Sequence, residues 1–404
     1  MSFTVEVLRA LKGDCLILQY GTKAAPGLAL IDGGPSTVYE KHLKPHLIEI
    51  RKSRGLEADA PLPVDVLMIS HIDDDHIQGI LKLTKELVNA QDALQSLPFK
   101  IGAVWHNTFD DIIGNATKSL TATVTAAFGA ASLSGDAGEV DGLDPDAARV
   151  LASLGQGLRL RDDTKKLKLR LNPQFDDKLV VANAKGPKIN MGKGLSFTVV
   201  GPMNPEVVAL RKTYERFFKE AAAKRKQATA VLAAFTDTSV PNLSSLVVLA
   251  EAGKKCVLLT GDARGDKVLE GLELVGRLTK DKKSRIHVNV LKCPHHGSNR
   301  NVDPIFFRRI IADHYIFSGN GEHGNPERET LEMLLDERGD EDYTVHLTYP
   351  VDEIDVERKK EAKSHGKQWL PKKHGISSFL DDNAEFKKKV LIVDETKPRV
   401  IKLT

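Results

Sequence analysis

The side chains best suited to chemistry in this chain are crowded into one short segment, VDVLMISHIDDDHIQGI (residues 64–80). An apolar run ends at Ser70, and imidazole or carboxylate groups then occupy five of the next six positions: His71, Asp73, Asp74, Asp75 and His76. Carboxylates this close together repel one another, and burying them is costly unless a cation pairs with them. The segment is therefore either an ordinary solvated turn or a metal site.

Three further loops carry carboxylate or imidazole groups, and each directly follows a predicted strand. They contain Asp32 in LIDGG, Asp262 in LLTGDA, and His295 and His296 in LKCPHHGSN. Imidazole and carboxylate suit zinc, manganese or non-haem iron, and a catalytic ion needs three or more protein ligands and one open position. Each loop alone is a weak signal, because Asp-Gly-Gly is usually a turn. All four in this order, each at a strand end, predict a metal centre.

The spacing His-x-Asp-x-Asp-His suits two ions rather than one. Alternate residues of an extended loop point the same way, so His71 and Asp73 are expected to hold one ion. Asp75 and His76, at the start of the next helix, are expected to hold a second, with Asp74 pointing away. Two ions roughly 3.5–4 Å apart can share a hydroxide and clamp the reacting centre of a phosphoryl or acyl group.

The elements that must position these loops are short strands interleaved with helices. The first half predicts strands in FTVEVLRA, CLILQY, LALID, VDVLMIS and KIGAVWH, and helices near residues 39–51 and in IQGILKLTKELVN. The second half predicts a strand in LSFTVVGP, a long helix over residues 205–235, a hairpin of LSSLVVLAEA with KKCVLLT, and later strands in IHVNVLK, HYIFS, YTVHLTYP and VLIVD. This order favours an α/β (α+β) protein with two mixed sheets and outer helices over a parallel barrel, which needs regular alternation.

The composition is that of a globular protein with reduced thiols. The chain has 404 residues, 41% hydrophobic and 28% charged, with a net charge of +3 and three widely spaced cysteines. The odd number argues against a disulfide framework, no apolar run approaches the roughly 20 residues of a membrane span, and the first residues do not resemble a signal peptide. A cytoplasmic location without membrane contact is expected. Basic residues cluster locally, as in residues 357–374, where a solvated face is the simpler interpretation.

The motifs together resemble the metallo-β-lactamase superfamily, and most closely its branch containing the hydrolase domain of the DNA-uptake protein ComEC. KGDCLIL, LIDGG, SHIDDDHIQG, LLTGDA and CPHHGS occur in the order of that branch. The resemblance implies an αββα sandwich of two mixed sheets with helices on the outer faces. It predicts a hydrolase domain over residues 1–350, with an insertion at about 107–188, and a Lys-rich extension, 351–404, packed on the same domain.

The resemblance also implies a role for each motif residue. His71 and Asp73 would bind the first metal and Asp75 and His76 the second, with Asp262 bridging both. His295 is preferred over His296 as the residue completing the second site, and Asp32 would orient a ligand or the motif loop without touching metal. In the expected mechanism, Asp75 would orient the hydroxide or accept its proton, and His296, His323 or Lys292 would steady the leaving group or non-bridging phosphoryl oxygens.

Three departures from the family pattern stand out. Asp73 occupies the usual second histidine position, as in the ComEC-like branch, and the oxygen-rich site shifts the expected metal from Zn²⁺ toward Mn²⁺. The Gly-His-Thr motif has no match; its nearest equivalent is VVGPMNP, residues 199–205, so the first metal lacks a ligand unless His106 or another residue supplies one. The late Tyr-Gly-His-Pro is replaced by EHGNP, which contains His323 and Asn325.

The expected function is hydrolysis by a hydroxide that two divalent ions activate, with nucleic acid or a nucleotide as substrate. Two alternatives remain open: hydrolysis of a lactone, thioester or other small ester on the same metals, and a non-catalytic binding or sensor module. A nuclease should bind through a basic, open groove and weaken steeply with salt, whereas a small-ester hydrolase should have a closed apolar pocket. No protein partner is predicted.

Overall fold

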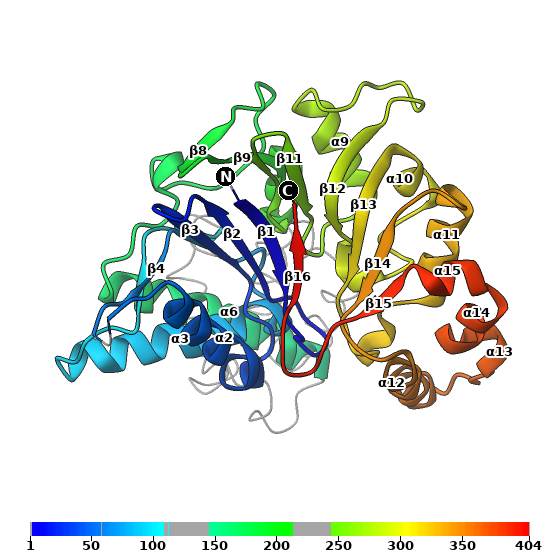
Figure 1. Ribbon diagram of the computed structural model, residues 1–404, viewed down its shortest axis with the longest axis horizontal. Coiled ribbons are helices and arrows are strands. Elements are labelled where there is room, and N and C mark those ends of the chain that lie inside the picture. Colours follow the sequence, from blue (N-terminus) through cyan, green and yellow to red (C-terminus); the bar gives the residue numbers. More distant parts are fainter. Residues whose placement is uncertain (1, 58, 109–111, 113–144, 213–243, 404) are drawn as a thin grey trace.

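The computed structural model describes residues 2–57, 59–108, 112, 145–212 and 244–403. Two mixed sheets form its centre (Figure 1). The six-stranded sheet has the order β16 (Arg399–Lys402), β1 (Ser2–Val7), β2 (Leu16–Gly21), β3 (Pro26–Ile31), β5 (Val66–Met68), β7 (Val104–Trp105). The eight-stranded sheet has the order β15 (Val390–Ile392), β14 (Thr344–Leu347), β13 (Ile310–Phe317), β12 (Ile286–Lys292), β11 (Lys255–Leu259), β10 (Val247–Ala252), β9 (Leu195–Gly201), β8 (Ile189–Gly192).

Alternation of side chains along the strands explains how the sheets pack. In β2, Leu16 and Leu18 belong to one buried cluster, which they share with residues of the eight-stranded sheet such as Val248 and Val290. Ile17, between them, points to the other face and joins a cluster with residues of the outer helices. Successive side chains of a strand point to opposite faces, so both faces of each sheet are buried.

Helices cover the outward faces of both sheets (Figure 1). The six-stranded sheet is covered by α2 (Lys44–Ser53) and α3 (Asp74–Asp92), and the eight-stranded sheet by α9 (Gly265–Leu274), α10 (Pro304–Arg309), α11 (Arg328–Arg338) and α12 (Val351–Ser364). A third buried cluster fills the space between the eight-stranded sheet and its helices. The predicted α/β class with mixed sheets is confirmed, and a parallel barrel is excluded.

The parallel parts of the two sheets determine where loops can meet. β11, β12, β13 and β14 run parallel in one sheet, and β3, β5 and β7 run parallel in the other. Their carboxyl ends lead into Asp262, His295, Ser318, Asp32 and His71. Parallel strands end at the same edge of a sheet, so the motif loops collect at one edge of the molecule.

Several local predictions have clear outcomes. The hairpin of β10 and β11 is confirmed by their antiparallel pairing. The helix expected near residues 39–51 begins with a π turn over Tyr39–Leu43 and continues as α2. Residues 204–212 are helical, but the rest of the helix expected over 205–235 lies outside the described residues. Of the described helices, none is both long and apolar enough to span a membrane.

The C-terminal segment contributes to both sheets. After α12 the chain forms α13 (Pro371–His374), α14 (Ile376–Asp382) and α15 (Ala384–Lys388), and Ile376, Phe379 and Phe386 join the core beneath the eight-stranded sheet. β15 then pairs with β14, and β16 crosses to pair with β1 in the other sheet. Residues 351–403 therefore supply a strand to each of the two sheets.

Candidate metal centre

Close backbone contacts fix the loop that carries the His-x-Asp-x-Asp-His motif. A Cβ added at Gly13 would lie 1.8 Å from the carbonyl oxygen of Asp75, and one added at Gly79 would lie 2.0 Å from the carbonyl oxygen of Gly33. Only glycine permits such an approach. The first turn of α3 is thereby locked between the turn before β2 and the turn after β3, and this sets the direction of the motif side chains.

Asp75, His76, Asp262 and His296 form a compact group of ligand atoms, all within 4.8 Å of one another. His76 Nε2 lies 3.3 Å and His296 Nε2 3.4 Å from Asp262 Oδ1. Asp75 contributes Oδ2 at 3.5 Å from His296 Nε2. Ligands about 2.1 Å from a tetrahedral ion lie about 3.4 Å from one another, so these separations fit a single ion.

A second, more open group surrounds the other oxygen of Asp262. His71 Nε2 lies 3.7 Å and His295 Nε2 3.5 Å from Asp262 Oδ2. Asp73 Oδ2 lies 3.6 Å from His71 Nε2, and its side chain is 29% exposed. The two oxygens of Asp262 therefore face different pairs of histidines, as a bridging carboxylate requires.

The sequence preference for His295 in the second site differs from this arrangement. The structure groups His296, and not His295, with Asp75 and His76. The two histidines diverge because each has a left-handed backbone, with φ of 47° at His295 and 55° at His296. That conformation is uncommon for residues other than glycine and often marks functional sites. Here it turns neighbouring imidazoles toward opposite oxygens of one carboxylate.

All four histidines have the same pattern of partners, an oxygen at Nδ1 and Asp262 near Nε2. Nδ1 lies 3.3 Å from Ser245 Oγ in His71, 2.9 Å from Asp32 Oδ2 in His76, 2.9 Å from Asn301 Oδ1 in His295 and 3.0 Å from Ser318 Oγ in His296. Metal-binding histidines almost always use the second ring nitrogen in this way, because it orients the ring and leaves the first nitrogen bare.

Buried ligand atoms without hydrogen-bond partners show whether these residues could fit a metal. In His71, His76 and His296, Nε2 is buried without a hydrogen-bond partner, and so is Oδ1 of Asp262. Buried polar atoms without partners are rare in folded proteins, and a metal-binding site is one of the standard reasons for them. Three such nitrogens around one carboxylate, whose own Oδ1 also lacks a partner, fit a pair of cations.

Asp32 holds the motif loop from behind. Its carboxylate accepts hydrogen bonds from the Ser70 amide and hydroxyl, both at 2.7 Å, as well as from His76. Asp32 has a left-handed backbone, with φ of 56°, and is almost fully buried. This placement agrees with the orienting role that the resemblance implies.

Asp14 and Lys292 form a second support; Lys292 was expected to steady the leaving group or phosphoryl oxygens, but it is buried against Asp14, which the sequence did not mark as a site residue. Asp14 Oδ2 lies 2.5 Å from Lys292 Nζ, Asp14 Oδ1 lies 3.3 Å from His296 Nδ1, and Asp14 also accepts a hydrogen bond from the Ser318 hydroxyl. Lys292 is buried and lies 3.8 Å from Asp262 Oδ1. The available signal was the Gly-Asp of KGDCLIL, which was used only as a family motif.

The electrostatics of the centre show an excess of negative charge. Burial alone lowers the pKa of a histidine, but Asp262, Asp32 and Asp75 outweigh it and raise the pKa of His76 well above its ordinary value. Burial and the charges of Asp75 and Asp262 raise the pKa of Asp73 to about 7. Without cations, Asp73 and the imidazole of His76 therefore tend to keep their protons. Metal binding is expected to release these protons.

The remaining predicted residues lie around this centre. Asp74 accepts hydrogen bonds from Gln156 and Gln78 and so faces α6 (Pro145–Lys166) and its own helix, as expected for a non-ligand. His106 is buried with both ring nitrogens lacking partners, and among the described residues it joins no group of metal ligands. His323 is exposed on the loop that follows Ser318.

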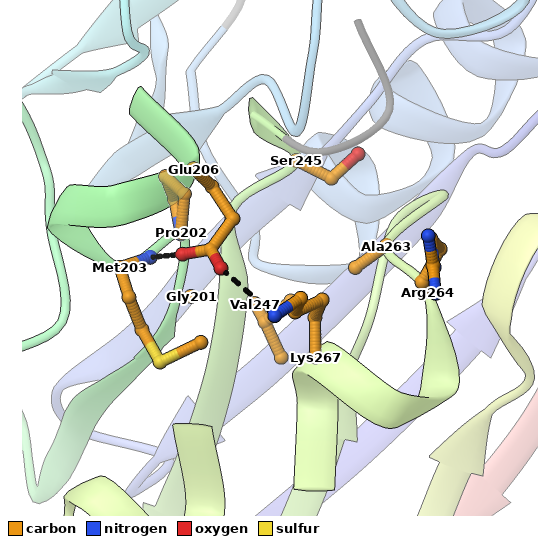
Figure 2. Close-up of a pocket in the computed structure, with 9 residues that line it drawn as sticks. All are labelled: Gly201, Pro202, Met203, Glu206, Ser245, Val247, Ala263, Arg264 and Lys267. Atoms are coloured by element: carbon orange, nitrogen blue, oxygen red, sulfur yellow. Dashed lines mark hydrogen bonds and ion pairs between the residues drawn. The ribbon is translucent and has the colours of Figure 1, made fainter. Parts of the chain in front are cut away.

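A small pocket borders the more open group of ligands around Asp262 Oδ2 (Figure 2). It has an empty volume of about 250 Å³ and is lined by Gly201, Pro202, Met203, Glu206, Ser245, Val247, Ala263, Arg264 and Lys267. Ser245 connects it to the metal centre, since its hydroxyl contacts His71 and accepts a hydrogen bond from the Asp262 amide at 3.2 Å. The pocket therefore lies beside VVGPMNP, the segment in which a third-motif histidine was sought.

Comparisons with known proteins do not assign a family. No protein-family model matches the chain. A segment of 85 residues, 20% of this chain, is 31% identical to microtubule-associated protein 1A of Rattus norvegicus, Mus musculus and Homo sapiens. The matched segment spans 3% of the length of those proteins.

Proposed function

We propose that this chain is a two-metal hydrolase of the metallo-β-lactamase superfamily, acting on phosphodiester bonds of nucleic acid or nucleotides. The observation that carries the proposal is the shared geometry of four histidines, each held at Nδ1 by an oxygen and directed at Nε2 toward Asp262. The layered order of helix, sheet, sheet and helix, with the motif loops at one edge, supports the superfamily assignment.

The donor set divides between two divalent ions, Zn²⁺ or Mn²⁺. The first would be held by His71, Asp73, His295 and Oδ2 of Asp262, and the second by Asp75, His76, His296 and Oδ1 of Asp262. When bound, such a pair supplies an activated water and neutralises charge on phosphoryl oxygens. His295 fills the role of the missing third-motif histidine, so the first site does not need His106.

The protein groups have distinct tasks around the bound substrate. Asp75, 17% exposed and close to His296, is placed to accept the proton of an attacking water. Asp32 and Asp14 keep His76 and His296 in the tautomer with a bare Nε2. Lys292 is buried and paired with Asp14, so it balances charge within the protein and does not contact substrate. His323, exposed on the loop that begins at Ser318, is the candidate for a phosphoryl oxygen or leaving group.

The pocket beside Ser245 keeps small-ester hydrolysis as the second candidate. Its empty volume includes open solvent, and the space that a water-sized group can occupy is only about 10 Å³, far below the roughly 300–1,000 Å³ of most small-molecule sites. Glu206, Arg264 and Lys267 also give it a charged wall, unlike the apolar pocket expected for a lactone or thioester (Figure 2). The phosphodiester proposal is therefore preferred.

The test compares Asp75→Ala with Asp74→Ala, which removes the same charge from the next residue in the sequence. Bound metal is measured on each protein after reconstitution with Mn²⁺ or Zn²⁺, and hydrolysis is assayed on bis(p-nitrophenyl) phosphate, single- and double-stranded DNA, RNA and a lactone. We expect two equivalents of metal in the wild type, and a loss of at least 100-fold in phosphodiester hydrolysis for Asp75→Ala only. Less than one equivalent of metal with no activity would refute the enzyme. Activity on the lactone alone would refute the phosphodiester substrate.

A further inference from the structure

Lysines without acidic partners are concentrated on one rim of the molecule. α12, α13 and the turn between them expose Lys359, Lys363, Lys367, Lys372 and Lys373. None of these five forms an ion pair with another described residue. We call this group the lysine rim.

The acidic residues of the same segment do not neutralise the rim. Glu357 pairs with Lys360 at 2.5 Å, and Glu361 lies 3.6 Å from His365. Asp355 accepts hydrogen bonds from the backbone amides that begin α14. The exposed Asp352 and Glu353 lie in the first turn of α12, whereas the rim begins at its third turn. The field over the rim is therefore positive.

The rim is joined to the metal centre by one loop, residues 318–327. The loop begins at Ser318, whose hydroxyl contacts His296 Nδ1 at 3.0 Å. The loop then contacts α12, where the buried Arg358 donates a hydrogen bond from Nε to the Gly324 carbonyl at 3.0 Å. Arg358 also donates to the His374 carbonyl at 2.6 Å, which ties α13 to the same loop. The loop carries the exposed His323.

Sheet topology places the beginning of α12, which leads into the rim, at the edge of the sheet that carries the motif loops. α12 follows β14, whose carboxyl end lies at the same sheet edge as the loops bearing Asp262 and His295. Arg300 is exposed in the loop that follows the two ligand histidines and adds positive charge next to the centre. A polyanion that extends from the metal centre in this direction would therefore contact Arg300 and then the lysine rim.

We propose that the lysine rim binds the phosphate backbone of a nucleic-acid strand while one phosphodiester of that strand occupies the metal centre. This inference rests on the proposed function and specifies a polymer as its substrate. Backbone phosphates are recognised by Lys and Arg without regard to sequence, and each neutralised phosphate adds to the salt dependence of binding. The protein accordingly binds strands long enough to reach from the centre to α13, and does so without base preference.

The experiment measures binding separately from hydrolysis. A fluorescent single-stranded 20-mer is titrated with the full chain in EDTA, between about 50 and 200 mM salt, and affinity is read by anisotropy. The variant Lys363→Gln/Lys367→Gln/Lys372→Gln is expected to bind at least tenfold more weakly at the lowest salt. The slope of log K against log salt should fall in magnitude by about 2, because each lost phosphate contact contributes about 0.7 for a single strand.

The matched control is Lys280→Gln/Lys282→Gln/Lys283→Gln, which removes the same charge from the loop between α9 and β12. That loop precedes β12, while the metal centre follows it, so the control lies about 20 Å away across the seven-residue strand. Control binding should equal that of the wild type. Equal weakening by both variants, or no weakening by the rim variant, would overturn the proposal. So would tighter binding to vesicles with 30% anionic lipid than to the oligonucleotide. Hydrolysis of bis(p-nitrophenyl) phosphate, assayed in parallel, tests the metal centre alone.

Discussion

The ion pair of Asp14 and Lys292 lies almost wholly out of water, with side-chain exposures of 2% and 1% and an Oδ2–Nζ distance of 2.5 Å. Burial alone would raise the pKa of Asp14 and lower that of Lys292. Lys292 together with His296 and His76 outweighs burial and lowers the pKa of Asp14, and Asp14 together with Asp262 and Asp32 raises the pKa of Lys292. Removing one member leaves a buried charge without its partner. Lys292→Met and Asp14→Asn should therefore each lower the free energy of unfolding by about 3–5 kcal/mol in metal-free protein.

The double variant should recover much of this loss. Asn at position 14 still accepts the hydrogen bond from the Ser318 hydroxyl, and Met at position 292 fills the volume of the lysine stem. We expect the double variant to be more stable than the sum of the single losses predicts, by about 2–3 kcal/mol. Urea unfolding in EDTA, with Lys388→Met as control, measures these values. Lys388 pairs with Glu385 at the surface, and its loss should cost at most about 1 kcal/mol. Additive single and double losses would refute the inference that the pair is a coupled, desolvated unit.

Three further predictions concern the support, the bridge and a pair outside the centre. Gly13→Ala should clash with the Asp75 carbonyl and cost about 1–3 kcal/mol in urea unfolding, with less metal bound, whereas Gly157→Ala, whose Cβ has no neighbour closer than 3.7 Å, should be tolerated. Asp262→Asn should bind less than one equivalent of metal in elemental analysis; two retained equivalents would contradict a bridging role. Burial lowers the pKa of His46, but the Glu6 carboxylate, 2.6 Å away, outweighs burial with the help of Glu49, so the pKa is raised. The pair therefore stabilises the folded protein fully below about pH 6.5, and this stabilisation is lost as the pH rises through the raised pKa. His46→Gln should therefore cost more at pH 6 than at pH 9 in thermal unfolding, and an equal cost would contradict the pairing.

Local patterns in the sequence predict the strands, and they also predict the motif residues of the candidate metal centre. His71, Asp75 and His76 lie within six residues, and their type and spacing carry the prediction. Alternation of apolar and polar residues in β1 predicts a strand because a strand exposes successive side chains to opposite faces, and the apolar run before Ser70 predicts a buried strand. These features depend on neighbours in the sequence.

The residues that hold the histidines at Nδ1 come from segments distant in the sequence. Ser245, Asn301 and Ser318 each hold one histidine, but serine and asparagine are common in loops and nothing in their local sequence marks them. The division of His295 and His296 between two oxygens of Asp262 arises from left-handed backbone angles at both residues. Local patterns predict glycine or asparagine in that conformation, not two histidines in succession.

The hydrogen bonds and ion pairs that hold the histidines at Nδ1 also explain how many carboxylates can lie close together without each needing its own metal cation. Asp32 is matched by His76 and the Ser70 hydrogen bonds, and Asp14 by Lys292, so the charges behind the rings are already compensated. Those in front, Asp73, Asp75 and Asp262, each lie within 3.6 Å of an imidazole nitrogen. Lys292 is 3.8 Å from Asp262 and can offset only part of that charge. The uncompensated negative charge therefore lies on the side where the bare Nε2 atoms converge, and divalent cations held there would balance it.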